Sequence, residues 1–201
     1  MKMIFYLSVM AFLTIGLLTG CQSPPVNSAA KKMAAQSTRN NGYSLLHQLL
    51  DQEKNVALLR FIRPEEADVK QLMKKIAATS GAGSSLLEKF AQDDPTIRLD
   101  DVRLPPAEVA TREAIGATKK KELLSQSGDT FELTLLLTQA EALNYGWHLA
   151  EVTSQNEPQT EHARALAALG QDMQNLYHEV FALMLLNRET TANLAGKPPV
   201  N

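Results

Sequence analysis

The sequence predicts an all-α protein, an up-down helical bundle of about four to five helices that follows a flexible tether. Apolar residues recur at alternating spacings of three and four positions in several long segments. Proline, glycine and small polar residues stand between these segments, where helices end and begin. No alternating strand pattern of useful length occurs. Residues 42–190 are numerous enough for one domain with its own core.

The first helix of the bundle is expected to begin after Ser44 and to run to about residue 63. Leu46 and Leu50 lie on its apolar side, four positions apart, as one face of a helix requires. This helix would supply the first side of the core.

Proline and glycine divide the next part of the chain. Pro64 is expected to begin a second helix, because proline is tolerated in the first turn. The Gly-Ala-Gly run at 81–83 is expected to end that helix, and a short third helix would occupy 84–92. Residues 93–104 have an irregular pattern, which predicts an extended segment packed on the bundle.

Three further helices are expected in the second half. Two prolines at 105–106 begin one that runs to about Ser125. Asp129 and Glu132 resemble a capping box, which would begin a long helix through residue 152.

The last helix is expected at about 156–187. Its apolar residues follow one core-facing stripe: Leu166, Leu169, Met173, Leu176, Val180 and Leu183. Residues 191–201 are expected to form a loose tail, because Gly196 and two prolines cannot continue a helix.

The N-terminal segment has three parts in a fixed order: Lys2, an apolar run over 3–18, and the motif Leu18-Thr19-Gly20-Cys21. Such a segment resembles the signal peptide and lipobox of bacterial lipoproteins. The resemblance implies removal of residues 1–20 and a diacylglyceryl group on the Cys21 thiol. Since Gln22 rather than aspartate follows the cysteine, it also implies an outer-membrane location facing the periplasm in a Gram-negative host.

Two other interpretations fit this segment less well. The apolar run of 16 residues is short for a transmembrane helix, which needs about 20. An ordinary secretory signal could use the small residues at 28–30, but these lie about ten positions beyond the apolar run. The lipoprotein signal therefore fits best.

Charge and cysteine content exclude several classes of function. One of the 20 basic residues lies in 1–20, which leaves 19 against 22 acidic residues and a net charge of −3 after cleavage. This balance argues against nucleic-acid binding. Residues 21–41 are expected to be a flexible tether, with room for one helical turn at 29–36. The tether carries three basic residues and no acidic one, and would be attracted to anionic lipid headgroups. A single cysteine allows no internal disulfide.

Glu132 and Gln139 interrupt the apolar side of the long helix. A turn near residue 155 would place Glu132 level with His178, and His148 level with His162. Glutamate and histidine on facing helices hold the metals of ferritin-like proteins, although the Glu-x-x-His motif of that family is absent here. Glu132, His178 and His162 are therefore a candidate metal site, and the alternative is a structural Glu132 stabilised by the helix dipole.

The sequence thus favours a lipid-anchored envelope protein whose bundle binds another envelope protein without catalysis and without a cofactor. The alternative is a ferritin-like bundle that binds a metal or small ligand between its long helices. A third hypothesis is an envelope hydrolase that uses Glu132 or His148 as a base. No catalytic motif, such as a Gly-x-Ser-x-Gly elbow, supports it.

Overall fold

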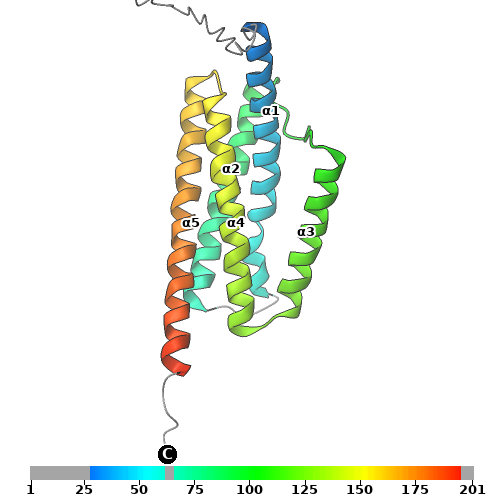
Figure 1. Ribbon diagram of the computed structural model, residues 1–201. Helices are drawn as coiled ribbons and strands as arrows, with labels where there is room; N and C mark the ends of the chain where they lie inside the picture. Colours follow the sequence, from blue (N-terminus) through cyan, green and yellow to red (C-terminus); the bar gives the residue numbers. More distant parts are fainter. Residues whose placement is uncertain (1–27, 62–65, 196–201) are drawn as a thin grey trace, which may run out of the picture.

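The computed structural model describes residues 28–61 and 66–195, and over these residues the protein is all-α, as predicted. The elements are α1 (Ser28–Glu53), the 3-10 helix η1 (Val56–Phe61), α2 (Ala67–Asp93), α3 (Pro106–Ser125), α4 (Gly128–Gln155) and α5 (Thr160–Ala195). Helices α1, α2, α4 and α5 form the bundle, and α3 stands at one side of it (Figure 1). The pair α4 and α5 has the most extensive contact.

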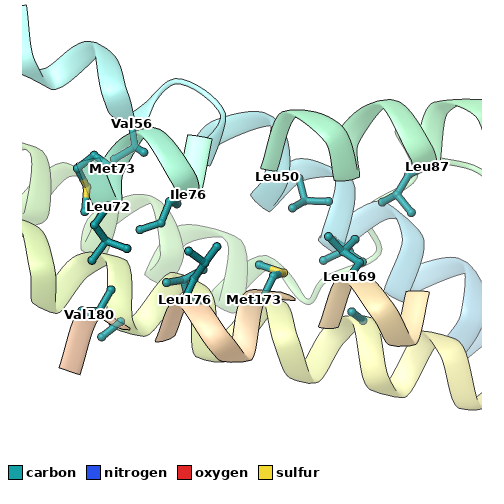
Figure 2. Packing of buried hydrophobic residues seen from close by; sticks show 14 of the residues in the cluster. Leu50, Val56, Leu72, Met73, Ile76, Leu87, Leu169, Met173, Leu176 and Val180 are labelled. Atoms are coloured by element: carbon teal, nitrogen blue, oxygen red, sulfur yellow. The ribbon is translucent and has the colours of Figure 1, made fainter. Parts of the chain in front are cut away.

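The core runs along the bundle axis between the four packed helices. Figure 2 shows its middle, where apolar side chains of α1, η1, α2 and α5 meet: Leu50, Val56, Leu72, Met73, Ile76, Leu87, Leu169, Met173, Leu176 and Val180. The stripe predicted on the last helix is buried from Leu166 to Val180, and Leu183 is partly buried against it. Each fully buried leucine or isoleucine contributes about 1.5–3 kcal/mol to stability.

Helix α1 begins at Ser28, well before the helix start expected after Ser44. Residues 28–41 are therefore helical rather than a flexible tether, and residues 22–27 lie outside the described residues. Two features explain the difference: the segment is rich in alanine, which favours helices, and Arg39 is buried by partners distant in sequence. Residues 28–38 remain exposed on nearly every side, and extend past the neighbouring helices (Figure 1).

Helix α2 continues through the Gly-Ala-Gly run that was expected to end it. Gly83 is buried, and a Cβ at its position would lie 3.0 Å from a methyl group of Leu169 and 3.1 Å from one of Leu50. The glycine thus permits close packing of helices instead of ending one. The predicted second and third helices are consequently a single helix.

The irregular segment and the helix after it agree with expectation. The chain between Asp93 and Pro106 contains no helix or strand, and Ile97 in it is buried against the bundle. Helix α3 has no buried residue. Arg112 Nη2 donates to Tyr145 Oη of α4 at 3.1 Å, and Lys119 pairs with Glu141. Thr134 of α4 donates to Gln126, the C-cap residue of α3, and Leu123 is partly buried against the core.

Two predicted helix ends differ from the structure. The N-cap of α4 is Ser127, and α4 has no side-chain capping bond, so the capping box at Asp129 is wrong. Helix α5 extends to Ala195, into the expected tail, and its end projects beyond α4 (Figure 1). Within the described ranges, no helix combines the length and apolarity needed to cross a membrane.

Candidate functional site

A buried polar cluster closes the end of the bundle where α4 turns into α5. Arg39 of α1 is only 2% exposed. Its Nε donates to Glu157 Oε2 at 2.8 Å, its Nη2 to Asp94 Oδ2 at 2.6 Å and its Nη1 to Thr96 Oγ1 at 3.1 Å. Together with Tyr43, whose hydroxyl donates to Glu157 Oε2 at 2.7 Å, these residues are named the polar clasp.

The electrostatics of the polar clasp hold both carboxylates ionised. Burial opposes ionisation of Glu157, but hydrogen bonds from Arg39, the Gln159 N–H and Tyr43 outweigh it, so its pKa lies below its usual range. For Asp94, bonds from Thr96 and Arg39 likewise outweigh burial and lower the pKa to about 2. Burial and the Glu157 carboxylate raise the pKa of Tyr43.

The chemistry of the polar clasp is structural. Each nitrogen of the Arg39 guanidinium already donates to an oxygen, and both carboxylates accept several bonds. These bonds connect groups that are far apart in the sequence. The polar clasp joins α1, the segment after α2 and the α4–α5 turn. The sequence does not reveal this cluster, because Arg39 lies in the segment that its composition predicts to be a flexible tether.

The candidate metal ligand Glu132 has a different partner from the one expected. It is 7% exposed, and its Oε1 accepts the backbone N–H of Glu66, the N-cap residue of α2. Burial raises the pKa of the Glu132 carboxyl, although the bond from that N–H lowers it in part. Glu132 therefore satisfies a helix N-terminus, which favours a carboxylate.

The two candidate histidines lie in unlike surroundings. His162 is buried and stacks on Phe90 with ring centroids 3.8 Å apart, and its Nδ1 has no hydrogen-bond partner among the described residues. His178 is exposed and meets Tyr177 edge-on.

The structure does not bring the three candidate ligands together. Helices α4 and α5 are joined by a short turn and run in opposite directions, so Glu132 and His162, each near the start of its helix, lie at opposite ends of the bundle (Figure 1). At 1.5 Å per residue, the separation is on the order of 30 Å. The described part of the chain contains no group of three or more His, Cys, Asp or Glu that could hold a metal. The arrangement thus gives a ferritin-like site no support.

Gln139 and His148, the other polar residues singled out, do not form a site either. Gln139 is 2% exposed, and its Oε1 lacks a hydrogen-bond partner among the described residues. Burial raises the pKa of the Glu53 carboxyl, and a hydrogen bond with the Gln139 side chain lowers it in part. His148 is exposed, and its Nδ1 lies 3.6 Å from Glu151 Oε2. Cys21, the predicted lipidation site, lies outside the described residues.

Helix α4 buries the side that Glu132 and Gln139 interrupt, but leaves two leucines exposed. Glu132, Leu135 and Gln139 are inside, whereas Leu133 is 48% exposed and Leu137 is 47% exposed. Two polar residues are thus buried while two leucines meet solvent. Such a local conflict between pattern and packing is expected at functional sites.

Helix α5 exposes two apolar side chains at about the level of these leucines. Gly170 packs on α4 near Trp147, because a Cβ there would lie 3.4 Å from the Trp147 carbonyl oxygen. Phe181 lies three turns after Gly170 on the same face of α5 and is 42% exposed. Leu185 follows one turn later and is 59% exposed. Since the helices are antiparallel, Phe181 lies about level with Leu137, and Leu185 with Leu133.

These four residues, Leu133, Leu137, Phe181 and Leu185, are named the outer seam. Aromatic rings continue it toward the clasp end of the bundle. Tyr177 lies 4.8 Å from Phe181 and 6.2 Å from Trp147 between ring centroids. The outer seam is therefore the apolar end of a longer exposed surface along α4 and α5.

No protein-family model, curated protein or solved structure matches this chain.

Proposed function

We propose that this protein is a lipid-anchored envelope protein whose helical bundle binds another envelope protein, without catalysis, through the outer seam. The observation that carries the proposal is the exposure of Leu133 and Leu137 on α4, while Glu132 and Gln139 of the same helix are buried. Single exposed apolar residues are ordinary, but a contiguous group of them marks an interaction surface.

The energetics favour a protein partner for the outer seam. A fully buried leucine or phenylalanine contributes about 1.5–3 kcal/mol, and the four seam residues are each 42–59% exposed. Covering what remains exposed would therefore provide several kcal/mol toward association.

The proposed anchor gives the bundle an orientation. Six residues separate Cys21 from Ser28, where α1 begins. Because Arg39 fixes α1 to the polar clasp, a lipidated Cys21 would hold the clasp end of the bundle toward the membrane. The opposite end of the bundle, nearer to Leu133 and Leu185, would then point away from it.

The exposed start of α1 suits a position next to a membrane. Lys31 and Lys32 are exposed, and the sequence has no acidic residue before Asp51. Each such lysine contributes about 1 kcal/mol of attraction to an anionic lipid surface. Met33, 73% exposed, adds an apolar side chain to the same turn.

The test places a photo-crosslinking amino acid at Leu137 in the full-length protein within Gram-negative cells. A matched control carries it at Gln71, an exposed residue of α2. We expect a discrete cross-linked envelope protein from position 137 only, and its loss when Phe181→Glu is added. Equal cross-linking from both positions, or none, would contradict the proposal.

The anchor is tested separately with Cys21→Ala. This variant should lose retention in the membrane fraction, because the diacylglyceryl group has no thiol to attach to. The circular dichroism of its isolated folded domain should match that of the parent. Retention of the variant in membranes after a high-salt wash would count against lipidation.

A further inference from the structure

A second feature of the α4–α5 surface lies toward the clasp end, apart from the outer seam. It is an open groove of about 440 Å³ between the two helices. The residues that matter for its chemistry are Trp147, Glu151, Gln155, Gly170, Gln171 and Gln174. Its size is within the range of small-ligand sites in proteins, roughly 300–1,000 Å³.

Glycine forms the floor of this groove. A Cβ at Gly170 would lie 3.4 Å from the Ala150 Cβ and 3.4 Å from the Trp147 carbonyl oxygen. The two helix backbones therefore approach closely here, and a larger residue at 170 would fill the space. What remains open is bounded by the long side chains on either side.

One wall is the half-buried indole of Trp147. The His148 imidazole stacks on it with ring centroids 4.3 Å apart and planes inclined by 20°. Tyr177 lies on the neighbouring helix at 6.2 Å. These two rings restrict the indole, so that a ligand would meet a preorganised aromatic surface.

The other walls are carboxamides that already have hydrogen-bond partners on their own helices. Gln171 Nε2 donates to Gln174 Oε1 at 3.0 Å and to Asn175 Oδ1 at 3.2 Å. Gln155 Nε2 donates to Glu151 Oε1 at 3.4 Å. Within the described residues, this leaves the Gln174 amide N–H groups as donors, and Gln171 Oε1 and Gln155 Oε1 as acceptors, for a ligand.

The charge of the groove restricts the ligand further. Its lining contains one carboxylate, Glu151, and no lysine or arginine. A phosphate or other anion would find no cation to pair with. A purely apolar ligand would leave the carboxamides without partners, at a cost of about 1–3 kcal/mol for each group.

We propose that this groove binds a neutral oligosaccharide. A sugar ring offers C–H groups to the indole of Trp147 and hydroxyl groups, each both donor and acceptor, to Gln171 and Gln174. Gln155 would meet the hydroxyls of the adjoining sugar unit on the α4 side. This activity goes beyond the proposed protein docking and uses none of the outer-seam residues.

Trp147 is the only tryptophan in the chain, so its fluorescence reports on the groove directly. Residues 22–201 would be titrated with chitotriose, maltotriose and cellotriose, each to about 10 mM, and binding confirmed by calorimetry. We expect a saturable change in intensity or wavelength with at least one of the three. No change in fluorescence and no heat with any of them would overturn the proposal.

Variants then locate the binding. Gln171→Ala and Gln174→Ala should each weaken the affinity by about fivefold, the effect of losing one hydrogen bond. The matched control is Gln52→Ala, at an exposed glutamine of α1, and it should bind as the parent does. Leu137→Glu should also leave saccharide binding unchanged. Equal affinities for the two groove variants and the control would overturn the assignment to this groove.

Discussion

Arg39 and Glu157 form a buried ion pair across 118 positions of the sequence, with 2.8 Å between Nε and Oε2. The pair fixes the early part of α1 to the turn that connects α4 and α5. Because Asp94 accepts from the same guanidinium, three separate segments depend on one cation. The consequences of removing it can be stated directly.

Arg39→Leu should destabilise the protein by about 3–5 kcal/mol, because it leaves the buried Glu157 carboxylate without its cation. The control is Arg98→Leu, since the Arg98 side chain is 62% exposed and its ion pair with Asp100 spans 3.6 Å. The control should change stability by less than about 1 kcal/mol. Urea denaturation followed by circular dichroism measures both, and similar losses in the two variants would contradict the clasp as a source of stability.

The polar clasp should also make stability depend on acid pH. The pKa values of Asp94 and Glu157 are lowered in the folded protein, so the unfolded chain binds more protons as the pH falls. Their contribution is present above the unfolded value of about 4, and is lost as the pH falls from about 4 toward 2. Asp94→Asn should flatten this part of the stability curve. An unchanged slope in that variant would show that other groups cause the acid sensitivity.

Glu132 should behave in the opposite sense. Its folded pKa is raised, so the folded state binds a proton more readily than the unfolded state, and ionisation costs stability as the pH rises. Glu132→Gln, which can still accept the Glu66 N–H, should therefore gain stability relative to the parent between about pH 4 and pH 7. Glu132→Leu should instead lose about 1–3 kcal/mol, because that N–H loses its acceptor. Denaturation at the two pH values separates these effects. If the parent instead became more stable relative to Glu132→Gln as the pH rises, the raised pKa of Glu132 would be refuted.

The sequence predicts the fold class well because the spacing of apolar residues and the position of helix-ending residues are local properties of the chain. The stripe from Leu166 to Val180 is buried as expected, and the irregular segment ends where α3 begins. Properties that depend on distant partners were not predictable in this way. The burial of Arg39 requires Glu157 and Asp94, and the continuation of α2 past Gly83 requires Leu169 and Leu50 on other helices.

The candidate sites differ from those that the sequence predicts for the same reason. The register of two antiparallel helices can be estimated from the turn between them, and this estimate places Glu132 level with His178. The partner of Glu132 is instead a backbone N–H on α2, a group that every residue except proline carries and that leaves no mark in a sequence. The outer seam was hidden for a related reason, since a leucine in a helical pattern is expected to be buried.

Gly42→Ala tests how tightly α1 packs on α4. A Cβ at this position would lie 2.1 Å from Thr153 Oγ1, and Thr153 is fully buried and β-branched, so it cannot move aside easily. The variant should lose about 1–3 kcal/mol. Adding Thr153→Ala, which removes the clashing hydroxyl, should restore part of the loss. A double variant no more stable than Gly42→Ala alone would place the strain elsewhere.

Leu137→Glu distinguishes an interaction surface from a part of the fold. Leu137 is 47% exposed, so a carboxylate there can remain hydrated and should change stability by less than about 1 kcal/mol. Leu135→Glu, two positions earlier, puts the same charge at a fully buried site and should unfold or severely destabilise the domain. The Leu137→Glu variant should therefore no longer bind the proposed partner, while the melting temperature of the variant stays near that of the parent. A large fall in that temperature would mean that the outer seam serves the fold itself, because the exposed leucine would then be contributing to packing within the chain.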